Sequence, residues 1–257
     1  MYLLEEKLRE KYGNGFTVFS TDFLDRVRTL DTIRQRRGEV TAYPKGERPV
    51  SAAAEQKRLY YLFDASAILH VYMPDEGLTP LLDHFLEQRG LQKAFLYVPN
   101  FCVAETFNAL ARKYYREGEL NEEMYRFCKE AFANDIHNGH LFYHLELNRY
   151  HVLDVDFIIP FEHLFPTERG DGTERKLSTF DALIIAMGME LSRITGGATY
   201  VITCDKRIAE VIRILRKLRK QERERQGVPD YIRFPREIYL YGKRLSELSC
   251  VEGQRVG

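Results

Sequence analysis

The sequence predicts an α/β protein whose mainly parallel sheet is covered by helices on both faces. Short apolar runs alternate along the chain with longer segments of helical periodicity, and this alternation is typical of βαβ units. With 257 residues, of which 44% are hydrophobic, the chain can bury a sizeable core. It could hold one domain, or one domain with extensions.

The N-terminal part has a different pattern from the rest of the chain. Residues 1–35 look helical, with a break at Gly13-Asn14-Gly15 and an apolar stripe of Phe23, Val27 and Leu30. Residues 36–57 are polar and interrupted by Gly and Pro, which is typical of a linker. We therefore expect an N-terminal helical extension and linker over residues 1–57.

The compact unit is expected over residues 58–226, and its strands are marked by short apolar runs bounded by turn or helix signals. These runs are LYYLF (59–63), AFLYVP (94–99), LFYHLEL (141–147) and TYVIT (199–203).

Helical periodicity fills most of the chain between and after these runs. The expected helices cover residues 65–72, 81–88, 101–117, 121–133 and 179–191, with a last long one beginning near Asp205. Residues 166–176 form a loop in this interpretation. The tail over residues 227–257 mixes aromatic and charged residues and could add an edge strand or a helix.

Composition limits the classes of partner. Lys and Arg number 38, as do Asp and Glu, so the protein as a whole does not attract nucleic acid, and any such partner must bind a local basic patch. The four cysteines lack CxxC spacing, which favours reduced thiols over disulfides or zinc. The N-terminus lacks an apolar signal region, and no stretch is apolar and long enough to span a bilayer. We expect a soluble, cytoplasmic protein without a membrane partner.

Four acidic residues carry the strongest functional signal: Asp64, Glu105, Asp181 and Asp205. Asp64 and Asp205 directly follow apolar strands, and Glu105 and Asp181 lie in the first turns of helices. In parallel α/β sheets, sites form outside the carboxyl ends of the strands. We therefore expect all four acids near one rim of the sheet.

Carboxylates that gather at the edge of an apolar core need a cation to neutralise them. Hard divalent ions such as Mg²⁺ and Mn²⁺ prefer carboxylate oxygens, and a metal held this way can hydrolyse phosphodiesters. The pattern thus predicts a metal-dependent nuclease. Clustered carboxylates also raise one another's proton affinity, so we expect its activity to fall in mild acid.

Each acid also has a purely structural interpretation. Asp64 and Asp205 suit N-cap positions, and Ser178 with Asp181 fits the spacing of a capping box. Glu105 shares a helical face with Asn108 and Arg112, which lie three and seven residues further along the helix, so it could belong to a solvated stripe with local pairing. Taken singly, each of the three aspartates is more commonly a helix cap. The arrangement of all four acids together favours a functional site.

Two hydroxyls accompany the acids. Ser66 and Thr203 lie two residues from Asp64 and Asp205, respectively. They are placed to orient a carboxylate or a metal-bound water.

The segments FDASAIL, AETFNAL, STFDALIIA and ITCDKRI, in this order, resemble the PIN-domain family, particularly its VapC-like ribonuclease branch. The resemblance covers roughly residues 58–215. It implies a three-layer α/β/α sandwich that binds Mg²⁺ or Mn²⁺ and cleaves RNA. The metal-site roles would fall on Asp64, Glu105, Asp181 and Asp205, with Thr203 as a supporting hydroxyl.

The family resemblance leaves the biological role open. The protein could be the toxin of a toxin–antitoxin pair, with a small antitoxin protein covering the acidic rim, or an RNA-processing endoribonuclease. The N-terminal extension, the long segment between Glu105 and Asp181, and the C-terminal tail depart from compact VapC-like proteins. A homodimer is expected by family analogy alone. The alternative is a catalytically inactive PIN-like module that binds RNA or acts as a scaffold.

Basic residues for RNA are expected after Asp205. Lys206 and Arg207 lie beside the expected metal site, where they could contact the scissile phosphate. Further along the helix, Arg213, Arg216, Lys217 and Lys220 line the side opposite its apolar residues. The alternative for this charged side is an ordinary solvated face.

Two other metal-site patterns are weak. His137, His140, His144 and His151 are close in sequence but match no usual zinc spacing. Residues 170–174 lack the ligand series of a calcium loop.

Overall fold

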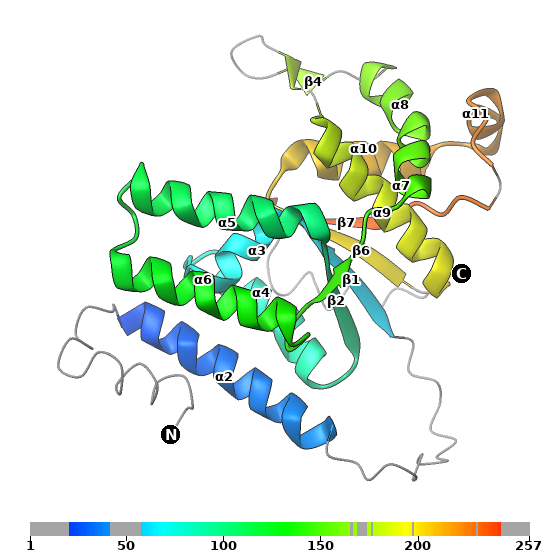
Figure 1. Cartoon of the computed structure of the whole chain (residues 1–257). Helices are drawn as coiled ribbons and strands as arrows, with labels where there is room; N and C mark the ends of the chain where they lie inside the picture. Colours follow the sequence, from blue (N-terminus) through cyan, green and yellow to red (C-terminus); the bar gives the residue numbers. More distant parts are fainter. Residues whose placement is uncertain are drawn as a thin grey trace, which may run out of the picture.

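Five parallel strands form the central sheet of the computed structural model, in the order β3-β2-β1-β6-β7 (Figure 1). The structure describes residues 21–41, 58–164, 167–168, 174–175, 177–196, 198–229 and 231–242. The strands are β1 (Leu59–Phe63), β2 (Ala94–Pro99), β3 (Tyr143–Leu145), β6 (Ala198–Thr203) and β7 (Arg236–Tyr239). The expected parallel α/β sheet is therefore confirmed.

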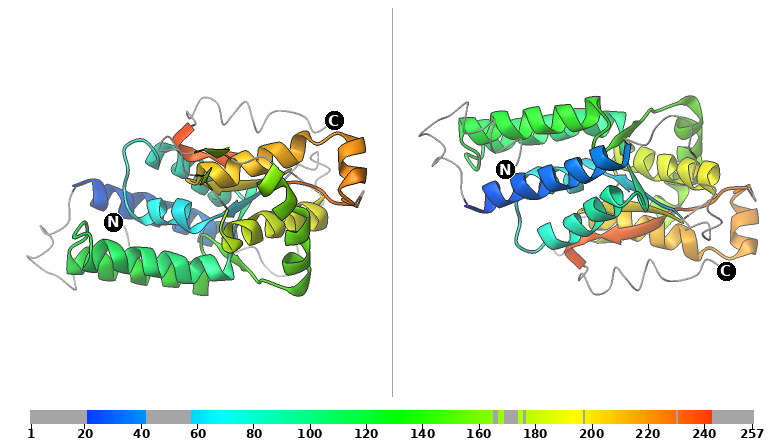
Figure 2. Two further views of the ribbon diagram at one scale, coloured as in Figure 1. Left: turned by 90° about the horizontal axis from the view of Figure 1, so that it is seen from above. Right: turned by 90° about the horizontal axis from the view of Figure 1, so that it is seen from below.

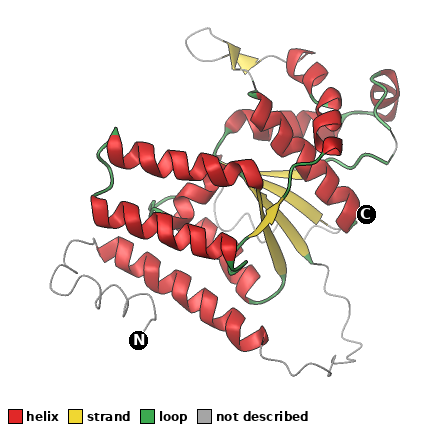
Figure 3. Ribbon diagram, in the orientation of Figure 1, coloured by secondary structure: helices red, strands yellow, loops and turns green. Residues whose placement is uncertain are grey.

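The helices gather in two groups with the strands between them. In Figure 1, α2–α6 lie to the left of the strands, and α7–α11 lie above and to the right, which is consistent with a three-layer α/β/α sandwich (Figures 1 and 3). Their bounds are α2 (Thr21–Thr41), α3 (Ala65–Tyr72), α4 (Thr79–Gly90), α5 (Asn100–Tyr115), α6 (Glu122–His137), α7 (Arg149–Asp154), α8 (Ile159–Leu164), α9 (Thr179–Thr195), α10 (Lys206–Lys217) and α11 (Lys220–Arg225). Short 3₁₀ turns cover Val155–Phe157 and Leu240–Gly242.

The order of the strands reverses at β1. From β1 the chain adds β2 and then β3 on one side, whereas β6 and β7 lie on the other. All six residues of β6 are buried, as expected for a central strand covered on both faces. Ligands of open α/β sheets bind at the carboxyl ends of the strands where the order reverses. In this protein that position lies between β1 and β6.

The N-terminal helix is part of the main core. Phe23, Val27, Leu30 and Ile33 on α2 are buried and join the same apolar cluster as the sheet. The helix packs against α4, and the view from below shows it along the outside of the molecule (Figure 2). Arg26 donates to the carbonyl oxygen of Val71 at 2.5 Å.

Several expected boundaries differ from the structure. Helix α2 continues to Thr41, into the segment expected as a linker, because residues 36, 37 and 39 are good helix formers that outweigh the single Gly38. The expected loop 166–176 contains the two-residue strands β4 (Thr167–Glu168) and β5 (Glu174–Arg175), which pair antiparallel. The expected break at residues 13–15, the linker beyond residue 41 and the weak calcium pattern at 170–173 lie outside the described residues.

The C-terminal part contributes a strand to the sheet. Residues 236–239, expected in a tail beyond the compact unit, form β7 and pair parallel with β6. Gly188 in α9 meets Pro235 just before this strand, where an added Cβ would lie 3.0 Å from the proline Cγ. The close packing of α9 on this side fixes the position of the helix that carries Asp181.

The burial of α2 makes a stability prediction. Replacing Leu30 by Ala removes buried methyl groups, so the free energy of unfolding is expected to fall by about 2 to 4 kcal/mol in urea denaturation. The matched control is Leu91→Ala, because Leu91 is exposed, and its effect is expected to stay below about 0.5 kcal/mol. Equal, small effects for both variants would mean that α2 is not part of the core.

Candidate active site at the carboxyl edge of the sheet

Asp64 is the most buried of the four acids. It follows β1 directly and caps α3, and it is only 3% exposed. Its Oδ1 accepts hydrogen bonds from Ser66 Oγ at 2.6 Å and from the backbone N–H of Ala67 at 2.9 Å. Its Oδ2 accepts from Thr203 Oγ1. The carboxylate is thus fixed in one orientation by partners from both α3 and β6.

The two hydroxyls connect the ends of these strands. Thr203 Oγ1 accepts a hydrogen bond from the backbone N–H of Asp205 at 2.8 Å while donating to Asp64. Ser66 Oγ likewise accepts from the backbone N–H of Cys204 at 3.0 Å while donating to Asp64. Both hydroxyls therefore orient a carboxylate, one of the two roles that their spacing predicts.

The three aspartates also serve as helix caps. Asp205 Oδ1 accepts from the backbone N–H of Arg207 at 2.6 Å at the start of α10. Asp181 Oδ2 accepts from the backbone N–H of Ser178 at 2.8 Å, and its own N–H donates to Ser178 Oγ at 3.1 Å, which completes a capping box. The structural interpretation is therefore realised for Asp64, Asp181 and Asp205.

Glu105 has no capping role. It lies half-buried in the second turn of α5, three residues after buried Cys102. Burial raises the pKa of Glu105, and the negative charge of Asp181 raises it further. The alternative of a pair with Arg112 is not realised, because the Arg112 guanidinium contacts Glu117 at 2.9 Å. Glu105 therefore faces the other acids.

The acids affect one another's pKa values in pairs: Asp64 with Asp205, Asp181 with Asp205, and Glu105 with Asp181. Burial raises the pKa of Asp64 from 3.8 to about 6; the hydrogen bonds from Ser66, Thr203 and Ala67 oppose this rise, and Asp205 adds to it. Burial likewise raises the pKa of Asp181, with a further contribution from Asp205.

Cys102 also interacts with two of the acids. Burial raises the pKa of its thiol, and Asp64 and Glu105 both raise it further, so the thiol lies near both carboxylates. The spacing of three residues between Cys102 and Glu105 places them on one helical face. The prediction of the site did not include Cys102, although this spacing in the sequence could have indicated it.

The four carboxylates suit a divalent metal in their donor atoms but not in their spacing. Four carboxylates are the hard oxygen ligands that Mg²⁺ and Mn²⁺ prefer. In the part of the chain that the structure describes, however, no three His, Cys, Asp or Glu side chains are grouped closely enough to hold an ion together. A shared ion would therefore require carboxylates to rotate and to give up part of their capping bonds.

The predicted basic contacts need correction. Arg207 is 1% exposed, so it is not a surface contact for phosphate. It lies four residues before buried Val211 and thus on the apolar side of α10. Lys206 is exposed, and its ammonium lies 3.6 Å from Glu210.

The remaining predicted cations on α10 are either paired with another residue or far along the helix from Asp205. Arg213 and Arg216 contact Glu237 on β7 at 3.1 and 3.2 Å. Lys217 lies eleven residues after Lys206, roughly 16 Å along the helix. These pairs favour the ordinary solvated face for this part of α10.

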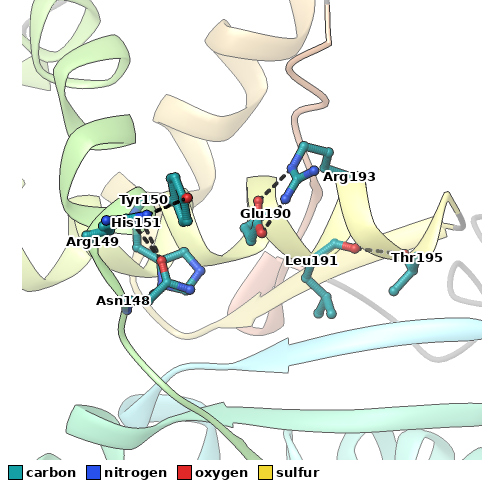
Figure 4. Close-up of polar contacts among 8 residues, drawn as sticks. All are labelled: Asn148, Arg149, Tyr150, His151, Glu190, Leu191, Arg193 and Thr195. Carbon is teal, nitrogen blue, oxygen red and sulfur yellow. Dashed lines mark hydrogen bonds and ion pairs between the residues drawn. The ribbon is translucent and has the colours of Figure 1, made fainter.

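The clustered histidines do not form a metal site in the described residues. His151 is buried and belongs to a capping box, in which its Nδ1 accepts from the backbone N–H of Asn148 at 3.0 Å (Figure 4). A cavity of about 390 Å³ lies near this helix, between α7, the C-terminal half of α9 and residues 231–233. It is lined by the ion pair Glu190–Arg193, and it is separate from the four acids.

Comparisons with known proteins give no further identification. Neither a scan of protein-family models nor a search of curated proteins returned a match to this chain. Among the described residues, none of the helices has the length and apolarity needed to cross a bilayer.

The buried charge of Asp64 makes a pH-dependent prediction. Because its pKa is higher in the folded protein than the 3.8 of an exposed carboxyl, the native state binds more protons between pH 4 and 6. Stability from this group is therefore highest below pH 4 and is lost as the pH rises through 6, by at most about 3 kcal/mol.

The test compares free energies of unfolding for the metal-free wild type and Asp64→Asn from pH 4 to 8. The variant is expected to gain relative to the wild type as the pH rises, and to lose this advantage near pH 4. Asp156→Asn is the control, because Asp156 is exposed and lies outside the acid set. A difference that does not change with pH would contradict the prediction.

Proposed function

We propose that the protein is a PIN-like, Mg²⁺- or Mn²⁺-dependent endoribonuclease that hydrolyses RNA phosphodiester bonds. The observation that supports the proposal is the position of Asp64 and Asp205 at the ends of adjacent strands, where the strand order reverses and Thr203 links the two residues. Glu105 is coupled electrostatically to Asp181, and Asp181 to Asp205. The four segments that resemble the PIN-domain family carry these same residues.

The residues divide into two roles. Asp64 and Asp205, at the ends of adjacent strands, are the main ligands in this proposal, and Glu105 and Asp181 complete the coordination. Thr203 is a positioning residue, since it fixes Asp64 and the Asp205 backbone at once. When bound, the divalent ion would lower the pKa of a water and stabilise charge on the phosphate.

This mechanism requires no histidine as a general base. Among the described histidines, His151 is used in a helix cap on α7. Without an ion, burial and the repulsion between acids raise the pKa of Asp64, Glu105 and Asp181, and a bound divalent ion would relieve this repulsion.

An inactive PIN-like module that binds RNA or acts as a scaffold is the second candidate. The observation that favours it is that three of the four acids already cap helices. Capping alone, however, does not require a negative charge at these positions, because asparagine caps helices as well as aspartate does.

The decisive experiment measures cleavage of a panel of single-stranded and structured RNAs with Mn²⁺, with Mg²⁺ and with EDTA. Cleavage is expected with either metal and not with EDTA. Asp64→Asn and Asp181→Asn are each expected to lower the rate at least about 100-fold, because a metal ligand is worth several kcal/mol. Asp156→Asn is expected to keep wild-type activity. RNA binding without any metal-dependent cleavage would make the inactive module the better interpretation.

The toxin role has a separate test. If the protein is the toxin of a toxin–antitoxin pair, its expression is expected to arrest bacterial growth, and Asp64→Asn is expected to abolish the arrest. Growth that is unaffected by expression of an active enzyme would favour RNA processing instead.

A further inference from the structure

Two phenylalanine rings border the acidic rim. Phe180 is the second residue of α9 and is 49% exposed. Its ring centroid lies 5.3 Å from that of Phe101 in the first turn of α5, with an angle of 36° between the planes. The pair thus connects the starts of two helices and leaves about half of one ring open to solvent.

The same two helix starts carry two of the acids. Phe101 and Glu105 are four residues apart and share a face of α5, and Phe180 directly precedes Asp181 on α9. Glu105 and Asp181 interact electrostatically with each other. The aromatic pair therefore lies beside this half of the carboxylate set.

Charge alone gives RNA a weak hold at this rim. The four carboxylates repel a phosphate backbone, Arg207 is buried, and Lys206 lies beside Glu210. Stacking on an aromatic ring does not depend on charge and accepts any of the four bases. A half-exposed ring next to the acids supplies this kind of contact.

We propose that Phe180, supported by Phe101, is a stacking platform for one unpaired base of the RNA next to the cleaved phosphate. This inference rests on the proposed nuclease function and assigns a base-binding residue to its site. A base can lie on a protein ring only when it is unstacked from its neighbours. The platform therefore binds a base of a single strand or a loop, and it does not bind a base inside a continuous duplex.

The experiment uses the full-length protein and a short single-stranded RNA that carries the fluorescent base 2-aminopurine. Binding is measured with Asp64→Asn in Mn²⁺ and with the wild type in EDTA, so that the RNA stays intact. Stacking is expected to quench the fluorescence, and a duplex of the same sequence is expected to show no quenching.

Three replacements at one position separate stacking from general apolar contact. Phe180→Tyr keeps the aromatic face and is expected to retain quenching and affinity. Phe180→Ala and Phe180→Leu are each expected to weaken binding about 10- to 100-fold and to lose quenching. Tyr115→Ala is the matched control, because Tyr115 is an exposed aromatic residue at the other end of α5, and it is expected to bind as the wild type does. Thermal unfolding of each variant checks that it is folded.

The outcomes distinguish this inference from the nuclease proposal. Quenching without metal-dependent cleavage would contradict the nuclease proposal but would still support the stacking platform. Metal-dependent cleavage with no effect of Phe180→Ala or Phe180→Leu on RNA binding would overturn the platform alone. If Phe180→Ala instead weakens binding of a protein partner and leaves RNA binding intact, the rings are a protein contact and the inference is wrong.

Discussion

The buried carboxylate of Asp64 is the group on which the carboxyl edge of this sheet depends. A charge that is removed from water is costly unless it is hydrogen-bonded, and Asp64 accepts bonds from Ser66, Ala67 and Thr203. Two of these partners also bind the backbone that follows β6. The same atoms that stabilise the carboxylate therefore hold β1 and β6 in register at their ends.

The capping of helices partly conflicts with the metal binding proposed above. Capping bonds fix the three aspartates at the starts of three helices. The same bonds occupy oxygens that a metal would need. Glu105 escapes this conflict because it lies inside α5 and caps no helix. It is the acid whose presence a purely structural role explains least.

Local patterns in the sequence predicted the strands and the positions of the acids well. The runs that form β1, β2 and β6 are apolar at nearly every position, and β6 is buried throughout, so their signal is continuous and strong. Asp64 and Asp205 follow such runs, and parallel strands deliver their ends to one edge. The burial of Arg207 could also be predicted from the sequence, because its spacing from Val211 places it on the apolar side of α10.

Other features depend on contacts between distant segments, which no local pattern contains. The pairing of Arg213 and Arg216 with Glu237 joins α10 to a strand about twenty residues later. Strand β7 is half-buried and rich in charge, so its sequence resembles a solvated tail. The packing of α2 on α4, and the meeting of Phe101 with Phe180, follow only from the arrangement of whole helices.

The pairing of β1 with β6 has a consequence for biosynthesis. Proteins are made from the N-terminus, and β1 is complete some 140 residues before the strand that pairs with it and carries Thr203. Ser66 and Ala67 follow Asp64 at once, whereas Thr203 is made 139 residues later, so the full set of partners can form only after β6 has left the ribosome. A prematurely terminated product that ends before β6 would lack both Thr203 and Asp205, and its Asp64 carboxylate would keep only the hydrogen bonds from Ser66 and Ala67.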